Sequence, residues 1–274
     1  MIIIYMISLY INNLAGQNKV ISPLGNSVTV NLNTPIVLDD HKNYHMRLLQ
    51  ANIVYCTPNV FQNVNNQLSY TFNGNNRTIV FNQGLFTIDD INRQIAIFTS
   101  ETEGIPSLIE LLPDTSTSKI YLVFNRANIT VHCGATYSIL PTLGFPASTG
   151  DISNGSSYPD YVISTNQANL NSIQNIYIKC DIVTGSYQNA QTSNIIASVI
   201  PNVLPYSTIQ YVAQYPTRMN ITSRNIGYIT ITLVDDSGKD IDLGTNNGTL
   251  SPELWSVLIT ISQDELMTHR TMNV

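Results

Sequence analysis

The residues that could bind a metal or catalyse a reaction are few and scattered along the chain. Its four histidines are at positions 41, 45, 132 and 269. His41 and His45 are four residues apart, a spacing that places two metal ligands on one face of a helix. They lie at the start of a strand-like run and next to Asp39 and Asp40, where helical spacing is not expected. A solvated turn is therefore the preferred interpretation, and a metal site the alternative.

A second candidate is a group of four carboxylates at 235, 236, 240 and 242. Carboxylate oxygens are ligands that calcium prefers in proteins. The spacing departs from the D-x-D-x-D-G pattern of a calcium loop, and Ser237-Gly238 in its middle is typical of a turn. The sequence favours a charged hairpin tip over a calcium site.

Motifs of the common enzyme classes are missing. The chain contains no G-x-S-x-G, no G-x-x-x-x-G-K and no H-E-x-x-H. The spacing of its serines, histidines and aspartates does not assemble a catalytic triad. We therefore predict that the protein is not an enzyme and that it has no catalytic residue, no cofactor and no metal.

The three cysteines at positions 56, 133 and 180 are far apart and odd in number. They form no C-x-x-C pair, so neither a zinc ribbon nor a disulfide framework is indicated. We expect buried thiols, which suit assembly in a reducing compartment.

Low charge is the main anomaly of the composition. Only 11% of the 274 residues are charged, against about 25% in a typical soluble domain. The apolar fraction is 43%, and 32 asparagines and 35 isoleucines are present. This composition excludes an intrinsically disordered chain and a coiled coil. A net charge of −6, with 5 lysines and 7 arginines, argues against a specific nucleic-acid partner.

The first eleven residues are strongly apolar and resemble a signal peptide at first sight. They contain no lysine or arginine, and no clear cleavage site follows them. They are also too short to span a bilayer, which takes about 20 residues. Ile2, Ile3, Ile4 and Tyr5 favour β-structure, so we predict a strand here, one that could pair with a neighbouring subunit.

Short β-type runs separated by Asn, Gly, Pro and Ser account for most of the chain. In 176–182 and 228–233, apolar residues alternate with polar ones, which indicates antiparallel strands with one buried face. Asn73-Gly74 and 235–238 each predict a hairpin. The predicted strands are 28–31, 46–55, 68–72, 78–81, 120–124, 129–133, 175–183, 195–200, 209–213, 219–222, 228–234 and 255–261.

One convincing helix interrupts this pattern. Thr87 can cap it, and Asp90 stands three residues later, as in a capping box. Ile91, Ile95 and Phe98 then follow at helical spacing, which predicts a short helix over 87–98. Ser251-Pro252 indicates a further single helical turn before the last strand.

The most Ser-, Gly- and Asn-rich stretch, 147–159, predicts a domain boundary. We therefore predict an all-β protein built as antiparallel β-sandwiches. Two tandem jelly rolls would cover 1–148 and 161–274, with a linker at 149–160, because each half is long enough for eight short strands. The alternative is one jelly roll with an inserted β domain.

Four short segments, in their order along the chain, resemble small capsid proteins of virophages and polinton-type double-stranded DNA elements. The first, Gly84-Leu85-Phe86 with the following helix, is similar to their glycine–aromatic segment, and Leu143-Gly144-Phe145 to the end of their first half. The other two, 175–183 and 229–238, resemble the first strand of their second half and their final strands. The resemblance implies jelly-roll folds, self-assembly and a place in an icosahedral shell, and it implies no catalytic residues.

The predicted function is thus that of a structural capsid protein of a virion, assembled in the host cell from identical subunits and other capsid proteins. Two rolls per chain in a trimer would form a six-cornered tile, and one roll per chain in a pentamer would fill a vertex. A penton or minor capsid protein is therefore one alternative. Another is a receptor- or glycan-binding head that uses the tyrosine-rich loops 156–161 and 201–215. Low charge fits subunits covered by neighbours, because interface cores are depleted in charge.

Overall fold

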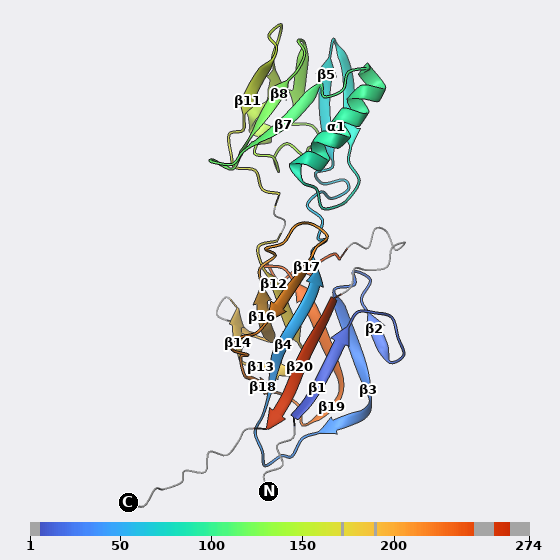
Figure 1. The fold of residues 1–274 in the computed structure, drawn as a ribbon, viewed down its shortest axis with the longest axis vertical. Helices are drawn as coiled ribbons and strands as arrows, with labels where there is room; N and C mark the ends of the chain where they lie inside the picture. The colour runs from blue at the N-terminus through green and yellow to red at the C-terminus, as the bar shows by residue number, and fades with distance from the viewer. Residues whose placement is uncertain (1–5, 171–172, 189–190, 244–254, 264–274) are drawn as a thin grey trace, which may run out of the picture. The chain divides into compact units, whose positions relative to one another are not determined.

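The computed structural model describes residues 6–170, 173–188, 191–243 and 255–263, and it divides the chain into two compact units. Unit 1 consists of Met1–Cys56 and Ile173–Val274, and unit 2 of Thr57–Ser172 (Figure 1). Unit 2 is thus inserted into unit 1. This division differs from the predicted boundary at 149–160, which falls inside unit 2. It corresponds to the alternative of one jelly roll with an inserted β domain.

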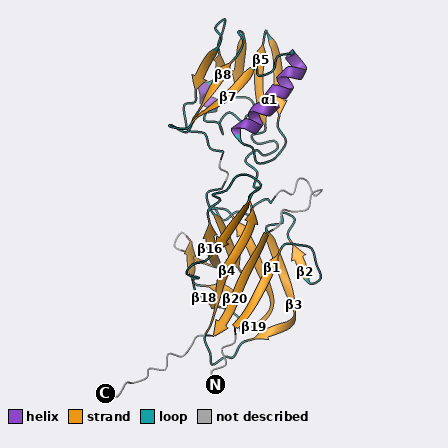
Figure 2. Ribbon diagram, viewed as in Figure 1, coloured by secondary structure: helices purple, strands orange, loops and turns teal. Residues whose placement is uncertain are grey.

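Unit 1 is a sandwich of two antiparallel sheets, shown as strands in Figure 2. The first sheet has the order β1-β20-β4-β18-β13, and β17 also pairs with β4. Its strands are β1 (Met6–Asn12), β4 (Tyr44–Val54), β13 (Val183–Thr184), β17 (Thr208–Val212), β18 (Met219–Ile221) and β20 (Trp255–Gln263).

The second sheet of unit 1 has the order β16-β12-β19-β3-β2. Its strands are β2 (Lys19–Ile21), β3 (Ser27–Val37), β12 (Ile176–Cys180), β16 (Ile195–Val199) and β19 (Asn225–Val234). A small hairpin of β14 (Ser186–Gln188) and β15 (Gln191–Ser193) stands apart from both sheets.

The order of the long strands is that of a jelly roll. Numbered along the chain as β1, β3, β4, β12, β16, β17, β19 and β20, they pair as 1-8-3-6 in one sheet and 5-4-7-2 in the other. Eight strands wound as two Greek keys in this way define the jelly roll. Unit 2 enters the roll between its third strand, β4, and its fourth, β12.

Alternation along the strands explains why the two sheets pack face to face. Ile229, Ile231 and Leu233 are fully buried, whereas Thr230 and Thr232 between them are half-buried. The same pattern recurs in β12, where Ile178 and Cys180 alternate with Lys179, as the sequence predicted. Each strand therefore contributes its apolar side chains to one core between the sheets.

The apolar N-terminal segment forms a strand, as predicted, but its partner belongs to the same chain. β1 pairs antiparallel with β20, with Ile11 opposite Val257. β1 is the edge strand of its sheet, so β20 takes the hydrogen bonds of one of its edges, and pairing of the other edge with a neighbouring subunit stays a prediction. Residues 1–5 lie outside the described part of the chain.

Unit 2 contains a four-stranded and a three-stranded sheet, of order β10-β9-β5-β6 and β11-β8-β7. Asn73 and Gly74 both have positive φ in the β5–β6 turn, which confirms the predicted hairpin. Tyr70, Phe81, Phe124 and Phe145 are among the largest side chains of its core. The strands are β5 (Gln67–Phe72), β6 (Asn75–Val80), β7 (Ile109–Asp114), β8 (Lys119–Phe124), β9 (Ile129–His132), β10 (Asp151–Ser153) and β11 (Asp160–Ile163), and a short 3-10 helix spans Ala147–Thr149.

The predicted helix is α1 (Ile88–Glu103), which runs five residues beyond the predicted end and stops at Gly104 in the left-handed conformation. Thr87 and Asp90 form the capping box: the Asp90 N–H donates to Thr87 Oγ1, and the Thr87 N–H donates to the Asp90 carboxylate. Ile91 and Ile95 are fully buried in the core of unit 2. No helix among the described residues combines the length and apolarity needed to cross a membrane.

Two local predictions, the hairpin at 235–238 and the helical turn at Ser251-Pro252, are not confirmed by the structure. After the turn at 235–238, the residues described up to 243 form a single bridge, between Val234 and Asp240, and no second strand. The helical turn predicted at Ser251-Pro252 lies outside the described residues.

Candidate functional site

Uncharged polar groups form part of the surface of the jelly roll. On the outer face of the second sheet, Ser27 Oγ lies 2.9 Å from Thr232 Oγ1, and Thr29 Oγ1 lies 3.0 Å from Thr230 Oγ1. These hydroxyl pairs link β3 to β19 across the strands, and such pairs stabilise a sheet. The part of this face on β3 and β19 is thus rich in hydroxyl groups, and Lys179 of β12 lies opposite Thr232 on it.

Exposed apolar side chains are concentrated in the segment 200–215, which contains β17 and the loops around it. Leu204 is 78% exposed and Tyr215 is 92% exposed, and Ile200, Tyr206 and Val212 are exposed as well. Single exposed apolar residues are ordinary, but a concentration of this kind within one segment makes it a candidate interaction surface. It coincides with the tyrosine-rich loop 201–215 that the sequence singled out.

The other tyrosine-rich loop, 156–161, belongs to unit 2. Tyr158 and Tyr161 are exposed there, and the Tyr161 ring packs edge-on against Tyr121, with ring centroids 5.5 Å apart. The two loops are therefore parts of separate units.

Two of the acidic groups singled out by the sequence, Asp39 and Asp235, accept backbone hydrogen bonds, and His269 lies outside the described residues. The backbone N–H of His41 donates to Asp39, which lowers the pKa of that carboxyl below its ordinary value. Asp235 accepts from the backbone N–H groups of Ser237 and Lys239 and so closes the turn at 235–238. Within the described residues, no group of three or more His, Cys, Asp or Glu side chains could hold a metal ion.

The structure brings together three polar side chains that the sequence did not group, namely Asp151, His132 and Thr71. His132 Nδ1 lies 3.0 Å from Asp151, and His132 Nε2 lies 2.8 Å from Thr71 Oγ1, so an acid, a histidine and a hydroxyl follow one another across β10, β9 and β5. Thr71 donates its own hydrogen to Asn76 Oδ1 at 2.6 Å. A base-activated nucleophile would have to direct that hydrogen to the histidine. The arrangement therefore acts as a cross-strand link.

The cysteines are buried, as predicted. Burial raises the pKa of Cys133 to about 11 and that of Cys180 to about 12. Thiols with such values are not ionised near neutral pH and are poor nucleophiles.

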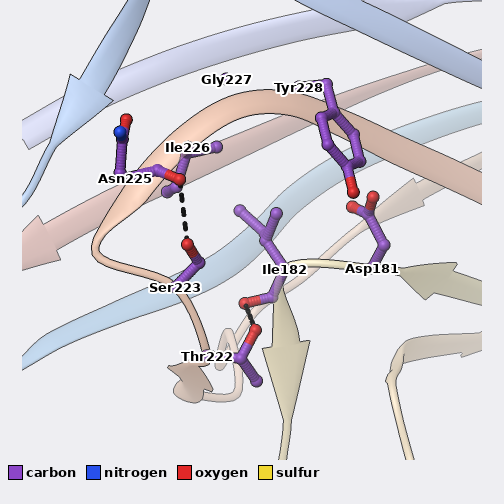
Figure 3. Close-up of a pocket in the computed structure, with 8 residues that line it drawn as sticks. All are labelled: Asp181, Ile182, Thr222, Ser223, Asn225, Ile226, Gly227 and Tyr228. Carbon is purple, nitrogen blue, oxygen red and sulfur yellow. Dashed lines mark hydrogen bonds between the residues drawn. The ribbon is translucent and has the colours of Figure 1, made fainter.

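A small pocket of about 200 Å³ opens on unit 1, and its polar side chains come from three parts of the chain (Figure 3). Asp181 and Ile182 follow β12, Thr222 and Ser223 follow β18, and the first residues of β19 complete the lining. Sequence reasoning missed this pocket, because residues about 40 positions apart form it and none of them belongs to a motif.

Hydrogen bonds within the pocket fix the directions of its polar groups. Thr222 Oγ1 donates to the carbonyl of Ile182 at 3.0 Å, and Ser223 Oγ donates to the carbonyl of Asn225 at 2.9 Å. Asp181 Oδ1 accepts from the N–H of Thr230 at 2.8 Å. In Figure 3 the Tyr228 hydroxyl and the Asp181 carboxylate point toward one another.

Together, the strand order and the surface define a jelly-roll protein with a second domain inserted between its third and fourth strands. Among solved structures, the crystal structure of a mavirus penton protein is similar, with a TM-score of 0.50 at 12% identity, over 95% of this chain and 100% of that one. This likeness shows the fold. No protein-family model matches the chain, and no curated protein matches it in sequence.

Proposed function

We propose that the chain is a penton-type structural subunit of a viral capsid, located in the virion. The observation that carries this proposal is the likeness of fold to the mavirus penton protein over nearly the whole of both chains. The four capsid-like segments of the sequence point independently to the same class of virus. A structural role is also consistent with the hydrogen bonds by which Asp235 closes a turn and His132 links neighbouring strands.

The division of the chain favours a vertex over a six-cornered tile. A tile made of three chains requires two rolls in each chain. Here one roll takes strands from both ends of the chain, and unit 2 has sheets of four and three strands with a helix. A subunit with a single roll suits a ring of five, in which each copy presents the same two surfaces to its neighbours.

Contact between copies would use the exposed apolar side chains of the segment 200–215. Their burial would be favourable at about 25 cal/mol per Å² of apolar surface removed from water. The hydroxyl groups of β3 and β19 would add less desolvation cost than ions, because uncharged groups are easier to remove from water.

Native mass spectrometry of the purified protein tests the stoichiometry. The proposal predicts a species with five times the 30.4 kDa mass of one chain, alone or on addition of other capsid proteins. A stable trimer would contradict the proposal and support a tile. A monomer that persists at high concentration and with capsid partners would contradict both.

A further inference from the structure

We propose that the pocket at the start of β19 binds a single sugar ring, such as the terminal residue of a glycan. The proposal goes beyond the capsid role, because a structural subunit does not need this pocket. It rests on the hydrogen-bonding capacity of the lining, on one exposed aromatic ring and on the size of the pocket.

The polar groups of the pocket present mainly acceptors. Thr222 and Ser223 have already donated their hydroxyl hydrogens to backbone carbonyls, so they offer lone pairs to a ligand. Asp181 has used one carboxylate oxygen on the Thr230 N–H, and its other oxygen has no hydrogen-bond partner among the described residues. A ligand that fits must bring several donors close together, as neighbouring sugar hydroxyls do.

Asn225 supplies the donors that a purely acceptor site would lack. Its side-chain amide is exposed and makes no hydrogen bond within the described part of the chain. An amide offers two N–H donors and one acceptor oxygen, which matches hydroxyl groups that both donate and accept. Figure 3 shows this side chain at the opposite end of the pocket from Tyr228.

Tyr228 gives the pocket an aromatic wall. Its side chain is 57% exposed although it lies on a strand, so its ring is available to a ligand. Tyrosine combines an apolar ring with a polar tip, which suits a ligand with an apolar C–H face and a polar rim. A pyranose ring has both.

The size of the pocket sets the size of the ligand. Its volume of about 200 Å³ is below the range of roughly 300–1,000 Å³ for pockets that hold drug-sized molecules. One six-membered ring is therefore the appropriate size. With so few contacts, we expect millimolar affinity, which several copies in one particle would raise through multivalency.

An organic ammonium is the competing ligand class, because it too brings several donors. The lining contains one carboxylate, and one of its oxygens already accepts a backbone hydrogen bond. The remaining polar groups are neutral, and Arg224 next to them donates to the carbonyl of Lys42 and lies 6.0 Å from the Tyr44 ring. An ammonium ion would need its full positive charge compensated, and the pocket offers one exposed carboxylate for this. A neutral polyol carries no charge to compensate, which gives it an advantage.

Gly227 provides a way to fill the pocket without disturbing the fold. It lines the pocket, its φ lies outside the positive range, and a Cβ added to it would meet no atom within 4 Å. Gly227→Leu therefore adds a bulky side chain at the wall of the pocket without a clash at its Cβ, and we expect it to restrict the ligand space. Gly16→Leu is the matched control, because Gly16 is exposed and an added Cβ would meet only the Lys19 side chain, at 3.9 Å.

The test is saturation-transfer NMR on the full chain with a panel of methyl glycosides and with butylammonium as the cationic probe. We expect at least one glycoside to bind. Gly227→Leu and Tyr228→Ala should each weaken this binding at least tenfold, whereas Gly16→Leu should bind like the unmodified protein. Equal thermal unfolding midpoints would show that the variants are folded.

Three results would overturn the proposal: no glycoside of the panel binds, binding survives in Gly227→Leu, or butylammonium binds in the pocket more tightly than any glycoside. All of these measurements are made on the purified chain. Their outcome is therefore separate from the stoichiometry that tests the capsid role.

Discussion

Asn13 Oδ1 accepts a hydrogen bond of 2.8 Å from the backbone N–H of Trp255 and so joins the residue after the first strand to the first residue of the last strand. Both residues are buried. The carbonyl of Gly25 accepts two further hydrogen bonds, from the Asn13 amide and from the indole N–H of Trp255. Three segments of the roll thus meet at one buried polar cluster.

Replacing Asn13 with alanine should destabilise unit 1. The change leaves the Trp255 N–H without its acceptor in a buried place, which costs about 1–3 kcal/mol, whereas the Gly25 carbonyl keeps the hydrogen bond from the indole N–H. Urea unfolding should show this loss in the free energy of unfolding. Asn220→Ala is the control, because Asn220 is exposed, and its effect should stay within about 0.5 kcal/mol. Equal stability of the two variants would contradict the role of the cluster.

Replacing Thr87 with alanine should destabilise unit 2 by about 1 kcal/mol, because the change removes the N-cap of α1. Thermal unfolding of the variant can be compared with that of Thr102→Ala, near the other end of the helix. Thr102 is exposed, and its hydroxyl donates to the carbonyl of Phe98 within the helix. A larger effect at Thr102 than at Thr87 would contradict the capping assignment.

The capping box should also depend on pH through Asp90. Hydrogen bonds from Thr87 lower the pKa of this carboxyl below its ordinary value of 3.8. A carboxyl with a lowered folded-state pKa stabilises the fold fully above its unfolded-state pKa and loses this contribution as the pH falls through the folded-state value. The stability difference between the native protein and Asp90→Asn should therefore shrink below pH 3.8. A difference that stays constant down to the lowered pKa would argue against ionised Asp90 as the acceptor.

Cysteine labelling should be slow in the native protein. With all three thiols buried, and with the pKa of Cys133 at about 11 and that of Cys180 at about 12, little thiolate is available at pH 8. Mass spectrometry after treatment with iodoacetamide should show almost no adduct without denaturant and three adducts in guanidinium chloride. Rapid labelling of Cys180 in the native protein would contradict its burial in the roll.

Unit 2 should fold when it is produced alone as residues 57–172. Its core has its own fully buried side chains, including Leu68, Ile91, Leu122 and Phe145. A fragment of this size with a continuous core should unfold in one cooperative transition. The matched fragment 1–148, cut at the boundary that the sequence predicted, lacks β10 and β11 of unit 2 and most strands of the roll. If that fragment unfolds cooperatively and 57–172 does not, the division into these units is wrong.

Charge introduced into the segment 200–215 should weaken assembly without unfolding the subunit. Leu204 is highly exposed in the single chain, so Leu204→Asp should leave the unfolding midpoint unchanged. Burial of the new carboxylate between copies would be costly, and the oligomer should dissociate at higher protein concentrations than the native one. Thr208 is exposed on β17 of the same segment, so Thr208→Asp introduces the same charge without removing an apolar side chain. Comparison of the two variants tests whether assembly depends on the Leu204 side chain or on any charge in the segment. Unaltered assembly of Leu204→Asp would exclude this segment as the contact.

The elements that sequence reasoning located depend on local physics. Thr87 and Asp90 lie three residues apart, so the start of α1 is encoded within one turn of helix. Asn73 and Gly74 specify their hairpin by backbone conformation alone. In β19, the alternation of isoleucine and threonine reflects one buried and one polar face.

The division of the chain was not predictable in this way. The stretch 147–159 is rich in Ser, Gly and Asn because it carries a 3-10 helix, β10 and the loop beyond it, all within unit 2. The crossings, after Cys56 and before Ile173, lie in stretches that are also rich in Asn but contain no glycine, so composition did not single them out. They follow from pairing of β4 with β17 and β20, strands more than 150 residues further along the chain. The candidate pocket depends on contacts between distant segments for the same reason.

The position of the chain in an assembled particle tests the capsid assignment most directly. Electron cryomicroscopy of particles that contain this protein should place the jelly roll around a five-fold axis, one copy for each fifth of the ring. Copies arranged around three-fold or local six-fold positions would contradict the penton assignment, and particles without density for the chain in their shell would contradict a structural role.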